Sequence, residues 1–563
     1  MGSNGGMSGG DFLQFSKQVI TGRWFCVFAS FLIMSGVGAT YLFAAYSKAI
    51  KATLGYSQTE INTIGFAKDF GANVGIIAGL IGEVTPVWFG LLIGAAMNFV
   101  GYFMMWLAVT GRIDRPRVWH MCVYIFLGTN SQSFANTGAL VTCVRNFPES
   151  RGAMIGLLKG YIGLSSAILT QIYLAIYGND AKSLILLIAW LPAAVSVVFV
   201  YSIRPMKLTR QPNELNVFYH FLYMSILLAL YLMAMNLLQR WTNFSQAAYA
   251  GSATVTVLLL LFPLGIAIRE ELVSWNQMKQ PIDPPNEVKV ENAAGLKLET
   301  KEEDTACFAD ICNKPPRGED HSILQALFSF DMIILFVATA CGLGSSLTAI
   351  DNLGQIGESL GYPTKTVSTF VSLVSIWSFF GRVFSGFFSE SLLSRYGIPR
   401  PLVLTFSLLI SCVGLLLIAF PTTGSVYAAT IIIGFSFGAQ MPLLFAIVSE
   451  LFGLKRFSTL SNCVQLAMPL GSYLLGVQLT GKIYDKEATK ELAKRGLIRS
   501  QVKELTCLGK NCYWLSFTTL AVVTFVGALS SLLLVYRTRD FYKGDIYKKY
   551  REEEAPIIGE NKG

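Results

Sequence analysis

Charged residues are scarce in this sequence of 563 amino acids. Asp, Glu, Lys and Arg make up 14% of the chain, whereas soluble proteins carry about 25%. So few charges cannot cover a soluble protein of 61.7 kDa without leaving large apolar patches in water. The composition therefore argues against a soluble multidomain enzyme, a disordered chain and a small disulfide scaffold. Lipid is the expected solvent.

Histidine is scarce as well, with three residues in the chain, which argues against a His-rich metal site. The sequence shows no paired catalytic constellation, so we expect no metal, no cofactor and no enzymatic activity. The net charge of +9 does not indicate nucleic acid, because the basic residues are spread over short segments between apolar runs. The expected partners are the lipid bilayer and a small-molecule solute. The oligomeric state stays open, and a monomer is compatible with the sequence.

Long apolar runs are abundant, and a run of about 20 mostly apolar residues can span a bilayer as a helix. Six such runs come first, two follow and six close the chain: 24–46, 61–81, 87–109, 119–144, 152–177 and 183–202; 218–238 and 247–268; 326–350, 367–389, 402–420, 426–450, 458–480 and 513–536. We therefore predict about 14 spans, or 12 if the middle pair does not cross.

The chain is predicted to divide at these runs into six parts. They are an N-terminal tail (1–22), a six-helix bundle (23–205), an inserted helix pair (206–268), a polar loop (269–325), a second six-helix bundle (326–540) and a C-terminal tail (541–563). An even number of spans puts both tails on one side. The Lys and Arg residues of the short loops favour the cytosol, although the basic loop 482–512 counts against it. Plasma membrane and endomembrane, such as the vacuole, both stay open.

An internal repeat divides the predicted spans into two halves. Gly79 and Glu83 end the second span as G-x-x-x-E, and Gly386 and Glu390 end the tenth span in the same way, 307 residues later. A second pair of matches follows the fourth and twelfth spans at an offset of 305 residues: Phe147 with Phe452, and Arg151 with Arg456. Two matches at nearly one offset indicate homologous six-helix halves in parallel orientation, which is the architecture of major facilitator transporters.

Several motifs resemble known families. The segment 381–400, with Gly386, Glu390, Arg395 and Arg400, resembles the facilitator signature G-x-x-x-[DE]-[RK]-x-G-x-[RK], lengthened after Glu390. Longer motifs resemble the plant nodulin-like family: RWF at 23–25, GVGATYLF at 36–43, GYSQ at 55–58, NFPESRG at 146–152 and DNLGQIG at 351–357. The resemblance covers residues 23–542. It implies an all-α membrane protein with the major facilitator fold, built from two parallel six-helix halves plus an inserted helix pair.

Ionisable residues inside the predicted spans are candidates for function, because charge inside a bilayer is costly. Lys68 and Asp69 lie within the second span. Asp69 could couple transport to protons or another cation while Lys68 holds its charge, or the two could form a static ion pair. Lys159 lies among glycines in the fifth span. Its amine could bind an anionic substrate, or it could extend along the helix to the membrane surface.

Polar uncharged residues in the spans form a second group of candidates. They must face protein or a watery cavity rather than lipid. Those that could line a substrate pathway are Asn130, Ser133, Asn136 and Thr137 in the first half, and Gln440, Asn462 and Gln465 in the second. Hydrogen bonds between helices are the alternative role for each of them.

The repeated signatures are candidates for gates between the halves. The residues concerned are Gly79, Glu83, Arg151, Arg382, Gly386, Glu390, Arg395, Arg400 and Arg456. The first copy has Val84-Thr85-Pro86 where the signature carries basic residues, which brings its salt bridge into question. For Arg151 and Arg456 the alternative is ordinary cytosolic positive charge.

Two functions are compatible with these features. The first is a secondary active transporter that moves a small solute by alternating access, with proton coupling and a small organic anion as further hypotheses; some relatives look like monocarboxylate or oxalate/formate carriers. The second is a transporter-shaped membrane receptor or regulator without transport activity. Cys507 and Cys512, in the last loop on the non-cytosolic side of the predicted topology, could form a disulfide.

Overall fold

The computed structural model describes residues 9–56, 58–178, 180–206, 214–242, 244–279, 314–362, 364–494, 507–544 and 546–547. Every regular element within these ranges is helical, so the predicted all-α class is confirmed. Eleven of the described helices are long and apolar enough to cross a membrane. The other three predicted spans, 119–144, 367–389 and 458–480, are helical as well, but Ser, Thr, Asn and Gln lower their hydropathy.

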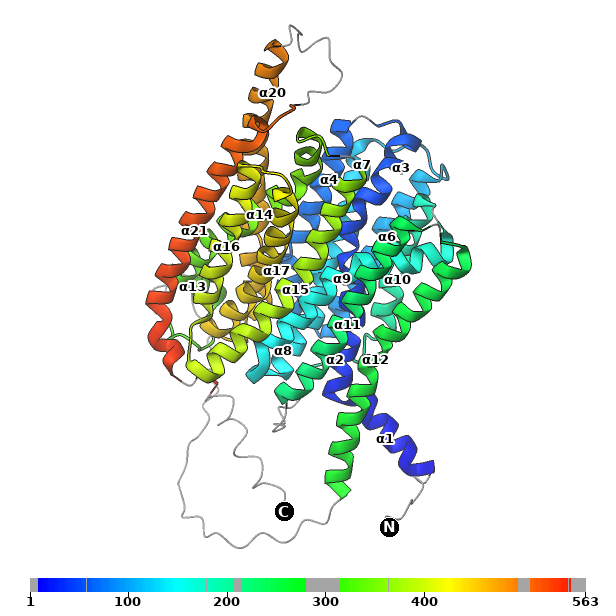
Figure 1. The fold of residues 1–563 in the computed structure, drawn as a ribbon. Coiled ribbons are helices and arrows are strands. Elements are labelled where there is room, and N and C mark those ends of the chain that lie inside the picture. Colours follow the sequence, from blue (N-terminus) through cyan, green and yellow to red (C-terminus); the bar gives the residue numbers. More distant parts are fainter. Residues whose placement is uncertain are drawn as a thin grey trace.

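The first half runs from α2 to α10 (Figure 1). Its elements are α2 (Arg23–Val37), η1 (Gly38–Leu42), α3 (Phe43–Leu54), α4 (Gln58–Asn73), α5 (Ile76–Val84), α6 (Val87–Val109), α7 (Val118–Asn136), η2 (Thr137–Val141), α8 (Thr142–Asn146), η3 (Pro148–Ser150), α9 (Arg151–Tyr177) and α10 (Ala181–Val198). Three predicted spans are interrupted: the first by a 3₁₀ turn at η1, the second by a break between α4 and α5, and the fourth by a π-helical turn at η2. Such interruptions often mark functional sites.

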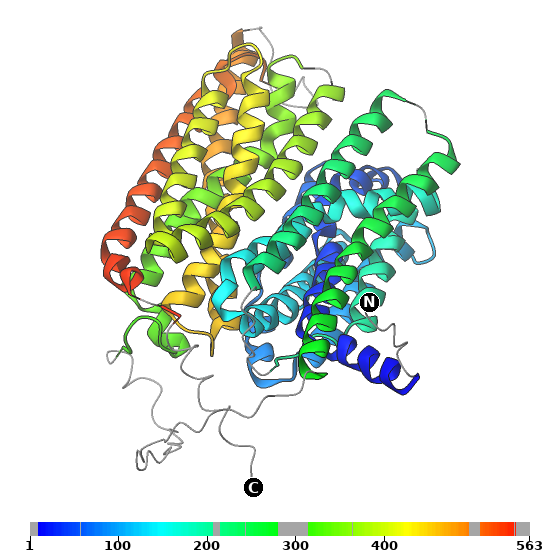
Figure 2. The same ribbon diagram turned by 60° about the horizontal axis from the view of Figure 1, so that its bottom comes forward.

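The second half runs from α13 to α21. Its elements are α13 (Ile323–Leu327), α14 (Phe330–Ser359), α15 (Thr364–Tyr396), α16 (Arg400–Ala419), α17 (Ser425–Leu451), α18 (Phe457–Gln465), α19 (Ala467–Ser472), η4 (Tyr473–Gly481), α20 (Lys482–Lys494) and α21 (Asn511–Lys543). Figure 2 shows the two halves side by side. They touch where α15 packs on α9 and where α18 packs on α5.

The inserted pair, α11 (Glu214–Trp241) and α12 (Gln246–Lys279), packs mainly on α9 and α2 of the first half. Trp24 is completely buried there and packs against the rings of Phe147, Phe218 and Phe221 in tilted and edge-on geometry. Beside this aromatic cluster, Arg23 forms a salt bridge of 2.8 Å with Glu214. The pair is therefore fastened to the first half.

Two helices extend beyond the apolar runs from which the parts of the chain were predicted. Helix α12 continues to Lys279, beyond the predicted limit at 268, and α1 (Gly9–Thr21) forms a helix within the predicted N-terminal tail. The two helices contact each other through Phe15 and Trp275, whose ring centroids lie 5.9 Å apart. The aromatic contact stabilises both helices outside the apolar segments from which the boundaries were inferred. Residues 280–313 of the predicted loop lie outside the described ranges.

Helix α1 and the end of α21 lie at one end of the molecule, and α20 lies at the other (Figure 1). We call the first end the gate face, because the repeated signatures meet there, and the opposite end the α20 face.

Candidate functional site: a gate and a central cavity

Two glycines let the halves approach closely at the gate face. A Cβ atom on Gly79 would lie 2.8 Å from the Cα of Thr459 in α18. A Cβ atom on Gly386 would lie 2.5 Å from the carbonyl oxygen of Gly152 and 2.8 Å from the Cα of Gly156, both in α9. Since backbone atoms cannot yield at such distances, any side chain at either position would separate the halves.

We call these two close approaches of the halves, at Gly79 and at Gly386, the crossings. Each crossing carries a carboxylate that caps a helix of the other half. The Oε1 atom of Glu83 accepts a hydrogen bond of 3.2 Å from the backbone N–H of Thr459. The Oε2 atom of Glu390 accepts one of 2.7 Å from the backbone N–H of Gly152. Thr459 and Gly152 lie in the first turns of α18 and α9, where free N–H groups and the helix dipole favour an anion.

The arginines that form salt bridges at the gate are not all those that the signature indicates. Arg456 supplies the cation that the first copy lacks, and its Nη1 atom lies 2.8 Å from Glu83 across the two halves. In the second copy Arg400 is fully buried and bridges Glu390 at 2.8 Å and Glu450 at 2.6 Å. The candidate Arg395 is exposed at the end of α15, and no salt bridge of Arg395 occurs among the described residues.

The other two arginine candidates lie at different depths. Arg151 belongs to the gate, where its Nη1 atom donates to the backbone oxygen of Ser449 in the second half at 2.9 Å. Arg382 does not lie at the gate face with Glu390. It lies deeper, where its Nη1 atom donates to the backbone oxygen of Lys159 at 2.9 Å, because two turns of α15 separate it from Glu390.

A cavity of about 100 Å³ lies between the halves above the gate. Both halves contribute to its wall, and most of the polar groups come from α4, α7 and α9. The lining residues are Val37, Thr40, Asp69, Ala72, Asn73, Gln132, Ser133, Asn136, Lys159, Ile162, Leu347, Arg382, Phe437, Met441, Gln465 and Met468.

Lys159 is a buried cation in this cavity wall, 6% exposed. Its Nζ atom donates to Oδ1 of Asn136 at 3.1 Å and lies 3.8 Å from the ring centroid of Phe445. The side chain therefore points inward, and extension to the membrane surface is ruled out in this conformation. Among the described residues no carboxylate lies within 4 Å of the amine, so Lys159 and the neighbouring Arg382 place two basic side chains in this part of the cavity wall.

Asp69 lines the cavity and keeps 41% of its side chain exposed. It forms a salt bridge of 2.8 Å with Lys68, whose Nζ atom also lies over the ring of Phe43. Asp351 of α14 interacts electrostatically with both residues of this pair. The charged pair of the first half therefore lies within electrostatic range of an acidic residue of the second.

The polar candidates separate into wall residues and structural residues. Ser133, Asn136 and Gln465 line the cavity, and Gln465 also donates to Asn73 of the other half at 3.3 Å. The other four candidates, Asn130, Thr137, Gln440 and Asn462, lie elsewhere. Asn130 donates to the backbone oxygens of Gly71 and Val74 at the break between α4 and α5; Thr137 accepts from Asn462 across the halves at 2.9 Å; and Gln440 is buried but does not line the cavity.

Four residues of the site escaped sequence reasoning. Gln132 and Asn73 are polar residues within spans and could have been found by that signal. Phe445 could not, because one aromatic residue in an apolar helix does not indicate a cation above it. Asp351 was visible only as part of the DNLGQIG motif, because it lies one residue beyond the predicted span 326–350, whereas Asp69 lies within its span.

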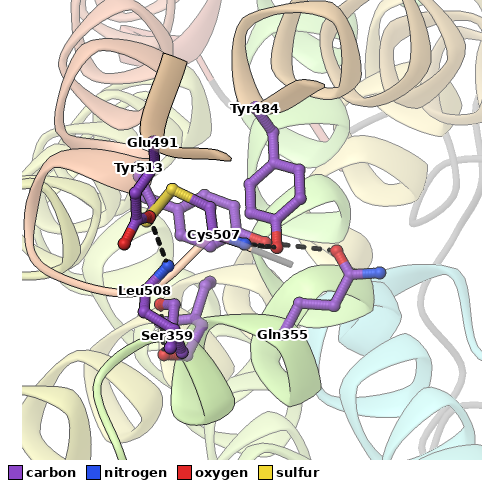
Figure 3. The surroundings of a disulfide bond; sticks show 9 residues. Gln355, Ser359, Tyr484, Glu491, Cys507, Leu508 and Tyr513 are labelled. Atoms are coloured by element: carbon purple, nitrogen blue, oxygen red, sulfur yellow. Dashed lines mark hydrogen bonds between the residues drawn. A yellow bond between two sulfur atoms is a disulfide. The ribbon is translucent and has the colours of Figure 1, made fainter. Parts of the chain in front are cut away.

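A disulfide between Cys507 and Cys512 closes the connection of α20 to α21, with a sulfur–sulfur distance of 2.09 Å. Figure 3 shows hydrogen bonds around it. The hydroxyl of Tyr484 accepts from the N–H of Cys507 at 3.0 Å, and Glu491 accepts from the N–H of Leu508 at 2.8 Å. Tyr513 and the backbone at Gly509 bond to the end of α14. The disulfide thus closes a short loop whose neighbouring hydrogen bonds attach the α20–α21 connection to α14.

Comparison with known proteins agrees with this arrangement. A family model described as Nodulin-like matches residues 23–268, and one described as NFD4, C-terminal domain, matches residues 322–544. Protein NUCLEAR FUSION DEFECTIVE 4 of Arabidopsis thaliana is 26% identical over 92% of this chain and 89% of its own length. Probable transporter MCH1 of Yarrowia lipolytica is 28% identical over 40% of this chain and 45% of its own length.

Solved structures share the fold at low identity. The proton:xylose symporter XylE bound to 6-bromo-6-deoxy-D-glucose is 12% identical, with a TM-score of 0.52 over 94% of this chain and 96% of that one. A double tryptophan mutant of XylE gives a TM-score of 0.53 at 12% identity, over 91% of this chain and 95% of that one. The protein is therefore a multi-pass membrane protein with the major facilitator fold. Since the two family models together cover most of the chain, it belongs to the nodulin-like family.

Proposed function

We propose that this protein is a secondary active transporter that carries a small organic anion through the central cavity by alternating access. The observation that carries the proposal is the pair Lys159 and Arg382, two cationic side chains in the wall of a cavity between two halves that are closed at the gate face. A buried charge is costly unless it is paired. A carboxylate substrate would supply the partner that Lys159 lacks among the described residues.

The transport cycle follows from the two-half architecture. Substrate enters from the α20 face while the glutamate caps of α9 and α18 hold the gate face closed. Rocking of one half against the other then closes the α20 face and breaks the caps. Since the caps are hydrogen bonds across the halves, they can break and form again without a change inside either bundle.

The proposal is tested with purified protein in liposomes and a panel of labelled small carboxylates, including formate and oxalate, with a neutral sugar for comparison. We expect uptake of at least one carboxylate and no uptake of the sugar. Lys159→Gln should lower carboxylate uptake about tenfold or more, since removal of a charged hydrogen-bond partner leaves the anion unpaired. Lys159→Arg should retain part of the uptake because it keeps the charge.

Lys510→Gln is the matched control, because Lys510 is exposed beyond the cavity, and its uptake should equal that of the wild type. Sugar uptake without carboxylate uptake would contradict the anion hypothesis. If none of the panel crosses the membrane while the protein stays folded, the receptor or regulator alternative would be favoured instead.

A further inference from the structure

The chain returns to the gate after its last helix. Helix α21 ends at Lys543, and four residues later Tyr547 is 9% exposed and belongs to the main hydrophobic core. Ile546 packs against the same core. A residue so close to the C-terminal tail would ordinarily be solvated, so its burial calls for a reason.

The hydroxyl of Tyr547 lies among three charged groups of the second half. It accepts a hydrogen bond of 3.1 Å from Nη2 of Arg400. It lies 3.2 Å from a carboxylate oxygen of Glu390 and 3.2 Å from one of Glu450, and its single proton can go to either. Burial, and then the two carboxylates, raise the pKa of Tyr547 well above its ordinary value against the opposing arginines. The hydroxyl therefore keeps its proton and remains a donor.

The same side chain also faces the first half. The guanidinium carbon of Arg151 lies 5.6 Å from the ring centroid of Tyr547, within the range of a cation–π contact. Glu390, held by Tyr547 through Oε1, uses Oε2 to accept from the N–H of Gly152. Tyr547 thus contacts one residue that closes the gate from each half, Glu390 from the second and Arg151 from the first.

We propose that Tyr547 is a positioning residue of the gate, which holds Glu390 toward Gly152 and engages Arg151, so that the C-terminal segment stabilises the conformation closed at the gate face. The contacts of Tyr547 within the second half can persist when the halves part, whereas its contact with Arg151 cannot. Removing the hydroxyl frees Oε1 of Glu390 and should weaken its hold on the N–H of Gly152, and removing the ring also abolishes the contact with Arg151, so both changes should shift the balance toward opening of the gate face. The inference does not depend on the identity of the substrate.

The test is hydrogen exchange on the purified full-length protein, followed by mass spectrometry of peptides that contain Gly152 and Thr459. Both amides are capped across the halves, so opening of the gate frees both. In Tyr547→Phe we expect both peptides to exchange about tenfold faster, the size of effect that a hydrogen bond to charged groups supports. In Tyr547→Ala the loss of the ring should increase the rate further.

Tyr396→Phe is the matched control, because Tyr396 ends α15 near the same face and is 72% exposed; its exchange should equal that of the wild type. The position of Thr459 makes the test selective, because the contacts of Tyr547 described above are with Arg151, Glu390, Arg400 and Glu450, which lie outside α18. Faster exchange at Gly152 alone would mean local loosening and would overturn the proposal, as would unchanged exchange at both sites. If Tyr547→Ala does not fold, Tyr547→Phe, which lacks one oxygen, decides the outcome. Because exchange is read without substrate, failure of the transport proposal would leave this result unaffected.

Discussion

Glu83 and Glu390, which lie 307 residues apart, each accept a hydrogen bond from the first turn of a helix in the opposite half. The backbone donors, Thr459 and Gly152, are also 307 residues apart. The two caps are therefore related by the internal repeat, and each half contributes one carboxylate and one helix N-terminus. This reciprocity means that the two crossings should open together.

Glu83→Gln tests the coupling of the two crossings. The substitution removes the charge that Arg456 and the N-terminus of α18 attract, and it is read at the other crossing, as hydrogen exchange of the Gly152 amide. We expect that amide to exchange about tenfold faster. Arg456→Gln should raise the rate by no more than about fivefold, since Arg456 is 41% exposed and such pairs contribute little.

Asp540→Asn provides the control for the Glu83 experiment, because Asp540 is a carboxylate with 79% of its side chain exposed. It should leave the exchange at Gly152 unchanged. An unchanged rate in Glu83→Gln as well would show that the crossings open independently.

Gly386→Ala should prevent closure of the gate face. The added methyl group would meet the backbone of Gly152 and Gly156 at less than 3 Å, and backbone atoms cannot move aside as a side chain can. We expect liposome uptake to fall more than about tenfold and the Thr459 amide to exchange freely. Gly265→Ala is the control, since nothing lies within 4 Å of a Cβ there. Normal uptake by Gly386→Ala would contradict the close approach.

The Cys507–Cys512 disulfide should stabilise the α20–α21 connection locally. The bond closes a loop with a sequence separation of 5, for which the loss of chain entropy corresponds to about 2 kcal/mol. The double variant Cys507→Ser and Cys512→Ser should therefore exchange faster at the amide of Gly509, which bonds to Ser359 of α14. Cys122→Ser, at a free cysteine, should not. Equal protection in both variants would show that the remaining hydrogen bonds suffice.

The fold could be predicted from the sequence because the length and apolarity of each span, and the internal repeat, are visible in the sequence itself. The cavity could be predicted only in part. Lys159 and Asp69 were evident because charge is rare inside spans, but helical spacing could not separate Asn130 from Asn136, since it does not say what lies opposite. Asn130 meets the backbone of a broken helix and Asn136 meets a buried amine. The role of Tyr547 was not visible at all, because its partners come from three distant segments.

Substitutions of Asn136 and Asn130 should therefore affect different properties, KM for the anion at Asn136 and the stability of the fold at Asn130. Asn136→Leu removes the acceptor that orients Lys159, so KM for the anion should rise about tenfold while kcat changes little. Asn130→Ala leaves the backbone oxygens of Gly71 and Val74 without their donor. We expect it to lower stability by about 1–3 kcal/mol with KM unchanged. Uptake kinetics and thermal unfolding of both variants check the contrast, and a raised KM in Asn130→Ala would assign that residue to the pathway instead.

Asp69→Asn tests whether the pair with Lys68 couples transport to protons. If protons enter from the α20 face and are carried by Asp69, wild-type uptake should increase as the pH on that face falls, because protonation releases the salt bridge to Lys68. Asp69→Asn mimics the protonated form permanently, so its uptake should no longer depend on pH. Asp180→Asn is the matched control, since Asp180 caps α10 through its oxygens and Asn caps helices equally well. A pH dependence in Asp69→Asn equal to that of the wild type would remove Asp69 as the coupling residue and leave the pair as a static contact between helices.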